Sequence, residues 1–525
     1  MDLTALGAAL PAILEDIHGS KFLWVTAAYS LASTAFLPMS GGVAQIFGRQ
    51  PAMLFALGLF ALGSALCGSA RSMTWLIGGR TVQGLGGGAI QSLTSIIISD
   101  LVSLRERGAY NAIVGLAWAF ASASGPLVGG ALAAQGKWRW LFYLNLPICG
   151  VAVLAVIFIL RLPVPQGTLR SKLKRMDWIG NLLIITSATV FIIGLSWGGA
   201  TYPWSSAHVV ATLVVGFVGF IVFLVYEAKW AANPIVPISI LSNRSSVSGY
   251  IQNFIAFFVL ISRIFFMSVF WQACKDASPI KFGVVDVGPA ASIGISVLAF
   301  GVSVAISKRY RPQLWAAWVL VVLGFGLMIR YTPQSSYAYV IGISVIPFIG
   351  LGAIASVAYF PVLAPLHVTQ NAYALAFFAF GRTFAGVWGI SISNTIFQNE
   401  LHNRLRPQFI EMLGGRPDDF NVDQLYGVLP RIRFLPDPPK AEVQQAFSDS
   451  ISTIWMVMTG LAGLGLLASL LMKDIPLQNV MDTKWTDKNV TSAREGTENH
   501  SQSGASSTDV KDEAKPTEGQ VLKEV

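Results

Sequence analysis

The chain has 525 residues, of which 54% are hydrophobic and only 12% are charged. Soluble proteins are about 45–50% apolar and about 25% charged, so this composition excludes an ordinary soluble enzyme and a disordered chain and indicates a polytopic membrane protein. The net charge of +9 does not indicate nucleic-acid binding, because the basic residues lie in short loops between apolar runs rather than on one face.

Apolar runs long enough to cross a bilayer as helices, which takes about 20 residues, follow one another along the chain. A shorter run from Leu3 to Ile13 precedes them, and we interpret it as the second half of a first helix. With it, the sequence predicts an all-α protein of fourteen spans. The thirteen longer runs are 22–44, 52–70, 74–99, 107–133, 139–160, 178–198, 207–227, 248–273, 282–306, 313–330, 338–359, 371–396 and 449–472.

The basic residues in the loops predict the orientation, since Lys and Arg gather at cytoplasmic ends of spans. If the first run leaves the cytoplasm, thirteen basic residues fall in inner connections and seven in short outer ones, which predicts a cytoplasmic C-terminus. The inner residues are Arg49, Arg105, Arg107, Arg161, Arg170, Lys172, Lys174, Arg175, Lys229, Arg244, Lys308, Arg309 and Arg311, and the outer ones are Lys21, Arg71, Lys137, Arg139, Lys275, Lys281 and Arg330.

The order of runs and loops predicts two helical bundles joined by a linker. The segment after Met472 is rich in charged residues, Ser and Thr, so it buries too little apolar area to offset the entropy of ordering. The predicted parts are an N-terminal six-helix bundle over 1–160 with an incomplete first helix, a basic cytoplasmic linker over 161–177, two additional helices over 178–227, a C-terminal six-helix bundle over 228–472 with a long outer connection over 397–448, and a disordered cytoplasmic tail over 473–525.

Four charged residues within the apolar runs are candidate functional residues. A charge in the hydrocarbon core costs from about 2.5 to more than 10 kcal/mol, so it usually faces a cavity or a partner. Arg80, followed one turn later by Gln83, has Asp2 as a natural partner if the first span lies alongside. Arg263 and Arg382 lie half-way along their runs, where cavity lining and a structural ion pair are equally compatible with the sequence.

Two further acids, Glu227 and Asp286, lie near the ends of runs, and we interpret them as reaching the head groups. The three cysteines lie in or beside apolar runs without a metal-binding spacing and are interpreted as packing residues. The five histidines are scattered along the chain, so we expect no metal site. No nucleotide-binding loop with Gly-Lys-Ser/Thr occurs, so we expect no ATP coupling and no cofactor.

Glycine and proline cluster in two neighbouring runs. Four glycines between Gly84 and Gly88 follow Arg80, and the stretch from Gly125 to Gly130 (GPLVGG) is expected to break the helix predicted over 107–133. Small residues let helices approach closely, whereas broken helices are common in transporters whose halves rock about a central site. Both interpretations are compatible with each cluster, and their joint appearance favours a transporter.

The loop after the second span, 41–51 (GGVAQIFGRQP), resembles the signature loop of the major facilitator superfamily, through Gly41, Gly48 and Arg49. Other motifs, in the same order, resemble those of the fungal fourteen-span drug:proton antiporters. They are Asp2 with Thr4 and Ala9-Leu10-Pro11, the second helix from Trp24 to Gly41, Arg80 to Gly86 with Gln83, the antiporter motif with Gly125, Pro126, Gly129 and Gly130, and the stretch from Trp138 to Pro147.

This resemblance implies the major facilitator fold, with a substrate site near the midplane between two bundles. It also implies export of small organic compounds, such as drugs, toxins or secondary metabolites, in exchange for protons. Asp2 would carry the proton beside Arg80, and Gly125, Pro126 and Gly129 would form a hinge and seal. We expect a monomer in the lipid bilayer, with the plasma membrane favoured over the vacuolar membrane.

The sequence departs from the family pattern at two places. Gln45 stands where the family has an Asp, and Gln50 stands where it has a basic residue, so Arg49 is the charged residue left in the loop. We therefore expect a weakened gate loop, or one held by a neutral hydrogen bond. The chain also begins at the family's membrane Asp, and we expect the first helix to be shortened.

Two other functions are compatible with the sequence. A transporter of the same superfamily could move basic amino acids into the vacuole or siderophores, but a carrier of cations needs carboxylates and past Asp2 we identify no mid-helix acid. A non-transporting sensor on this fold usually carries a long signalling extension, whereas this tail is short. An enzyme is excluded because no nucleophile, base and orienting group cluster.

Overall fold

The computed structural model describes most of the chain that the sequence predicts to be membrane-embedded. It covers residues 22–102, 107–160, 162–199, 202–406, 408–409 and 432–476 and six isolated positions, Ala5, Leu6, Ala9, Ile13, Asp16 and Ile17. These residues form helices and no strand, with one isolated bridge between Gly198 and Tyr202. The predicted all-α fold is therefore confirmed. Asp2 lies outside the described residues.

A helix covers each of the longer apolar runs that the sequence predicts. Ten helical segments of the described chain are long and apolar enough to cross a membrane, which confirms a multi-pass membrane protein, while the count of fourteen spans stays a prediction. The helices are α2 (Phe22–Phe47), α3 (Arg49–Gly68), α4 (Met73–Leu101), α5 (Arg107–Ala134), α6 (Trp140–Tyr143), α7 (Asn145–Ile159), α8 (Leu169–Lys174), α9 (Trp178–Trp197), α10 (Ala207–Lys229), α11 (Arg244–Cys274), α12 (Pro279–Ser307), α13 (Arg311–Met328), α14 (Tyr337–Val357), α15 (Tyr359–Leu363), α16 (Asn371–Arg404) and α19 (Pro439–Leu470).

Polar residues in the short loops cap the helices. Ser72 accepts a hydrogen bond from the backbone of Trp75 at the start of α4, and Asp177 accepts one from Gly180 at the start of α9. Such side chains satisfy backbone N–H groups that a helix leaves unpaired at its first turn. The same pattern recurs at α10, α11, α12 and α14, which Ser206, Asn243, Ser278 and Ser336 cap.

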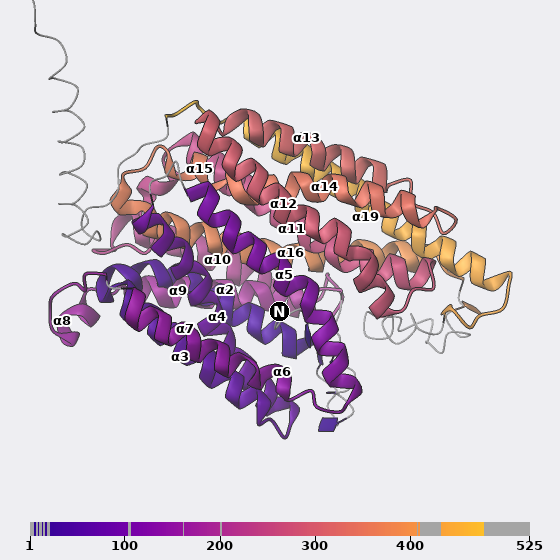
Figure 1. Ribbon diagram of the computed structural model, residues 1–525, viewed down its shortest axis with the longest axis horizontal. Coiled ribbons are helices and arrows are strands. Elements are labelled where there is room, and N and C mark those ends of the chain that lie inside the picture. Colours follow the sequence, from indigo (N-terminus) through magenta and orange to yellow (C-terminus); the bar gives the residue numbers. More distant parts are fainter. Residues whose placement is uncertain are drawn as a thin grey trace, which may run out of the picture.

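Helices close in sequence pack mainly with one another. In Figure 1 the indigo and purple helices α2, α3, α4 and α7 lie together in the lower part, and the salmon-to-yellow helices α11 to α14, α16 and α19 lie in the upper part. The groups meet mainly where α2 packs on α16 and α5 packs on α12, and α4 also contacts α16. The additional helices α9 and α10 pack on each other, and α9 touches both α2 and α16.

The helix α5 runs without a break from Arg107 to Ala134, so the predicted break at Gly125 to Gly130 is wrong. Instead, the motif provides a close approach: a Cβ added at Gly129 would lie 2.3 Å from the carbonyl oxygen of Ala5. The glycine lets the backbone of Ala5 lie against α5, and this contact does not depend on a break in the helix.

The glycines after Arg80 also serve packing. Gly84 and Gly88, one turn apart on α4, face α2, because added Cβ atoms would lie 2.4 Å from the carbonyl oxygen of Tyr29 and 2.6 Å from that of Ser33. On another side of α4, a Cβ at Gly86 would lie 2.4 Å from the backbone nitrogen of Phe60 in α3. The glycines therefore let α4 pack in backbone contact with both α2 and α3.

Replacing Gly84 by valine is expected to lower the free energy of unfolding by about 1–3 kcal/mol or more, because the new side chain meets backbone of α2 that has no room to move. Thermal unfolding of the purified protein in detergent measures the loss. Gly78→Ala is the matched control on the same helix, since nothing lies within 4 Å of its added Cβ. Equal melting temperatures for the two variants would contradict this close packing of α4.

Aromatic side chains join the additional helices to α16. Phe191 of α9 stacks on Trp388, with ring centroids 5.3 Å apart, and Phe220 of α10 contacts Phe384 at 5.6 Å. Trp204, in the connection between α9 and α10, donates to the hydroxyl of Thr395 over 2.9 Å. Ring contacts and a hydrogen bond thus attach α9 and α10 to α16.

Two sequence interpretations at helix ends need correction. Glu227 does not reach the head groups, since it is 5% exposed and its carboxylate accepts a hydrogen bond from the backbone of Val236. The long outer connection predicted over 397–448 is shorter than expected, because α16 continues to Arg404 and α19 already begins at Pro439. Most of the remaining loop lies outside the described residues.

Candidate functional site

Arg80 lies fully buried in α4 and is surrounded by acceptors and rings. Its Nε donates to the carbonyl oxygen of Val25 over 3.1 Å, and its Nη1 donates to Oε1 of Gln83 over 2.7 Å. The ring of Tyr29 lies 4.4 Å from Cζ. A guanidinium so placed is held by charge-assisted hydrogen bonds and a cation–π contact instead of water.

Gln83 extends this polar network to two more helices. Its Nε2 donates to Oγ of Ser64 in α3 over 2.9 Å, and Nδ2 of Asn145 in α7 donates to the same hydroxyl over 3.3 Å. Gln83 and Ser64 are fully buried. We define the polar network of α4 as Arg80, Gln83, Ser64 and Asn145. It connects α3, α4 and α7 within the apolar interior, and a network of this kind is costly if one member is removed.

Arg263 forms an ion pair with a partner that the sequence interpretation did not identify. Its Nη2 lies 2.9 Å from Oδ1 of Asp286 in α12, and its Nη1 donates to Oδ2 over 3.1 Å. The ring centroid of Phe348 in α14 lies 3.9 Å from Cζ of Arg263. The interpretation of Asp286 as a residue reaching the head groups is therefore wrong. Arg263 has a structural ion pair, the second of its two predicted possibilities.

Arg382 stands in contrast to these residues. It lies in the middle of α16, and its guanidinium carbon lies 4.1 Å from the ring centroid of Phe257 in α11. Within the described part of the chain it forms no hydrogen bond and no ion pair, and its Nε is buried. The cavity-lining role predicted for it stays a prediction.

The predicted gate loop lies at the end of the molecule where α2 ends and α16 begins. A Cβ added at Gly41 would lie 3.0 Å from both the carbonyl oxygen of Ala372 and Cβ of Ala376, so the backbones of α2 and α16 nearly touch there. Gly48, between α2 and α3, has φ of +95°, a conformation that glycine adopts without strain. Gln45 is half-buried and makes no hydrogen bond within the described residues.

Arg49 has a charged partner, so the expectation of a loop held only by neutral groups is wrong. Its Nε lies 2.7 Å from Oδ2 of Asp100 at the end of α4, and its Nη1 donates to the carbonyl oxygen of Ala44 over 2.9 Å. The exposed fractions are 1% for Arg49 and 5% for Asp100. The ion pair closes the turn between α2 and α3 against α4. Gln50 adds a hydrogen bond to the carbonyl of Val156 in α7 over 3.2 Å.

The antiporter motif supplies contacts rather than polar chemistry. Gly125 and Gly129 are buried in α5, and Gly130 has no atom within 4 Å of an added Cβ. Pro126 lies within the same continuous helix, and its side chain is outside the described residues. Its predicted role as hinge and seal stays a prediction.

Asp100 and Asp286 are the partners of buried arginines that the sequence interpretation did not identify. Both acids stand at or within a turn or two of a helix end, where head-group contact is the simplest expectation. One signal in the sequence could have identified them. The apolar runs contain few acids, and a buried arginine needs an acid as its partner. Deciding which acid serves which arginine requires knowing which helices are neighbours.

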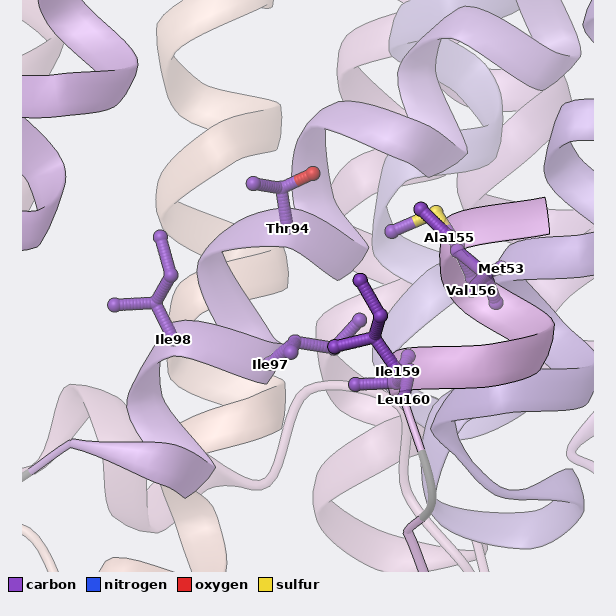
Figure 2. Close-up of a pocket in the computed structure, with 8 residues that line it drawn as sticks. All are labelled: Met53, Thr94, Ile97, Ile98, Ala155, Val156, Ile159 and Leu160. Carbon is purple, nitrogen blue, oxygen red and sulfur yellow. The ribbon is translucent and has the colours of Figure 1, made fainter. Parts of the chain in front are cut away.

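A surface groove between α3, α4 and α7 has a volume of about 260 Å³ (Figure 2). It contains none of the predicted site residues, and its polar member, Thr94, donates to the carbonyl of Ile90 within its own helix. It offers no charge and suits an apolar chain. In the described residues no group of three or more His, Cys, Asp or Glu lies together. The lining residues are Met53, Thr94, Ile97, Ile98, Ala155, Val156, Ile159 and Leu160.

A sequence model described as Major Facilitator Superfamily matches residues 1–392, which is most of the chain. The chain belongs to the Major Facilitator Superfamily. The resemblance to this superfamily seen in the sequence motifs is thus confirmed. The protein is a membrane transporter of this superfamily rather than an enzyme. The fold agrees, because a crystal structure of the human organic anion transporter MFSD10 (TETRAN) matches with a TM-score of 0.54 at 15% identity, covering 88% of this chain and 96% of that one.

Curated fungal relatives are similar over nearly the whole chain. The MFS-type efflux pump LUC4 of a Fusarium species is 33% identical over 500 residues, covering 92% of this chain and 87% of its own. The efflux pump FUS6 of Gibberella fujikuroi is 33% identical, covering 92% and 88%, and the MFS-type efflux pump MMF1 of Pseudozyma antarctica is 33% identical, covering 93% and 92%. This superfamily member therefore has named efflux pumps as relatives.

Proposed function

We propose that this superfamily member exports small organic compounds, such as toxins or secondary metabolites, in exchange for protons. Substrate binds between the two groups of helices, and the two groups rock to expose it to one side of the membrane and then to the other. The named function of the relatives, efflux, supports the direction of transport.

The observation that carries the proposal is the buried polar network of α4. Arg80 holds a positive charge at 0% exposure, with Gln83, Ser64 and Asn145 linking it to α3 and α7. A fixed buried charge of this kind favours the ionised form of a carboxyl group brought near it, whereas burial favours the neutral form. In the proposal Asp2 is this carboxyl group, and its protonation releases its hold on Arg80.

The second part of the proposal is a gate near the ion pair of Arg49 and Asp100. It lies at the end where Gly41 of α2 meets Ala372 and Ala376 of α16, a point of close approach between the two groups of helices. In the proposal this end faces the cytoplasm, and the contact of α2 with α16 closes it. Opening it for substrate entry separates α2 from α16 while Arg49 and Asp100 hold the turn intact.

Export that depends on the proton gradient tests the proposal. Cells expressing the chain are loaded with a panel of fluorescent dyes and toxic metabolites, and efflux is followed with and without an uncoupler. We expect efflux to collapse with the uncoupler, and Asp2→Asn to abolish the proton-driven part, because an amide cannot release a proton. Unchanged efflux in Asp2→Asn, with the variant present in the membrane at the level of the unmodified chain, would contradict the role of Asp2.

A further inference from the structure

Arg382 of α16 carries a positive charge that no carboxylate of the described residues pairs with. Among the residues that the structure describes, no carboxylate or carbonyl oxygen accepts a hydrogen bond from its guanidinium, and its contact is the face of Phe257 at 4.1 Å. The side chain is partly accessible although its Nε is buried. A ring face offsets only part of what a guanidinium loses when it leaves water.

Three other arginines buried in the helices show what a compensated charge looks like here. Arg49 has Asp100, Arg263 has Asp286, and Arg80 has the carbonyl of Val25 and the amide of Gln83. Each of the three is 1% exposed or less. Arg382 differs from these three arginines in having no acceptor among the described residues and in being partly accessible.

A second donor lies two turns further along α16. The indole Nε1 of Trp388 is buried and has no acceptor within the described residues. Its ring contacts Phe254 of α11, with centroids 6.2 Å apart, and Phe254 is one turn from Phe257. Two donors without acceptors thus rest on one aromatic face of α11. We call this contact, formed by Phe254, Phe257, Arg382 and Trp388, the α11–α16 seam.

The chemistry of the seam selects for negative charge and for rings. It offers a guanidinium, an N–H group and the faces of aromatic side chains, and it offers no carboxylate among the described residues. A lipophilic cation would be repelled by Arg382, whereas an aromatic carboxylate would pair with the guanidinium and stack on the rings.

We propose that the exported compounds are organic anions, aromatic or conjugated carboxylates in particular, whose anionic group pairs with Arg382 in the α11–α16 seam. This inference rests on the proposed export function and names its substrate class. Arg382 fixes the position of the charged end, and Trp388 donates to an oxygen of the same compound.

A matched pair of probes tests the proposal. Binding of 1-naphthoate and of its neutral analogue 1-naphthalenemethanol to the purified full chain in detergent is measured by equilibrium dialysis. The unmodified chain is expected to bind the naphthoate at least about tenfold more tightly, the usual effect of one charge-assisted hydrogen bond. The preference is expected to fall to about one in Arg382→Gln and to persist in Arg382→Lys, which keeps the charge.

Trp388→Phe keeps the ring and removes the N–H group, so it tests the seam even if Arg382→Gln does not fold. It is expected to reduce the preference for the naphthoate by about threefold to tenfold. A preference that is equal in the unmodified chain, Arg382→Gln and Trp388→Phe would overturn the proposal, as would the absence of any preference in the unmodified chain. Replacing chloride by gluconate separates a resident chloride ion: a naphthoate preference that appears only without chloride would assign the site to chloride.

Transport distinguishes failure of this inference from failure of the proposed function. Uncoupler-sensitive export of the neutral compound without any preference for the anion would overturn the substrate class and leave export intact. Export of neither compound, together with no uncoupler-sensitive efflux of any dye in the panel, would overturn both.

Discussion

Replacing Arg49 by glutamine is expected to lower the free energy of unfolding by about 3–5 kcal/mol, the usual loss when one partner of a buried ion pair is removed. Asp100, 5% exposed and 2.7 Å from Nε of Arg49, would keep a buried charge without its cation. The turn between α2 and α3 would also lose the hydrogen bond to the carbonyl of Ala44. Thermal unfolding of the purified protein in detergent measures the loss.

The double variant Arg49→Gln with Asp100→Asn removes both charges and is expected to recover part of the stability that either single variant loses. Arg404→Gln is the surface control. Arg404 lies 2.8 Å from Glu400, but both side chains are about one-third exposed or more, at 40% and 32%, so its loss should change stability by less than about 1 kcal/mol. A double variant that melts below both single variants would contradict the ion pair.

Replacing Arg80 by leucine is expected to reduce export by about 100-fold or more, because the polar network of α4 loses the charge that orients it. Two hydrogen bonds from the guanidinium disappear, to the carbonyl of Val25 and to Gln83, and each such bond contributes about 1.5–3 kcal/mol. The initial rate of efflux, normalised to the amount of protein in the membrane, measures the loss. Arg80→Lys is expected to retain part of the activity.

Thr81→Val provides the matched control one residue along α4. Thr81 is exposed, and its hydroxyl donates to the carbonyl of Ile77 within its own helix. Its replacement should leave the rate of export close to that of the unmodified chain. Export by Arg80→Leu at the rate of Thr81→Val would show that the buried charge has no part in transport.

The helices could be predicted from the sequence because the signal is local. An apolar run of about 20 residues has to satisfy its backbone hydrogen bonds internally in lipid, and only a helix does this within one segment. The position of Arg80 within such a run was likewise enough to single it out, because a charge there has to be compensated. The break in α5 was predicted wrongly, because α5 is continuous from Arg107 to Ala134 and its Gly129 serves close packing instead.

The partners of the buried charges could not be predicted in the same way. Arg49 and Asp100 are 51 residues apart, and Arg263 and Asp286 are 23 residues apart on different helices. Each pair forms because two helices become neighbours, and the sequence contains several acids near helix ends that could have served. The loop over 41–51, which looked weakened by Gln45, has its Arg49 paired with an acid of α4.

The sequence by itself determined that this protein is an α-helical membrane protein of the Major Facilitator Superfamily with arginines buried in its spans, since composition, run length and motifs are properties of single segments. Tertiary structure decided which of these arginines are compensated. Arg80 and Arg263 are turned toward acceptors on adjacent helices, and Arg382 is turned toward a ring. Arg49, which the sequence places in a loop, is buried against Asp100 of α4. The reason is that the free energy of a buried charge depends on what lies within a few ångströms of it, which only the packing of helices sets.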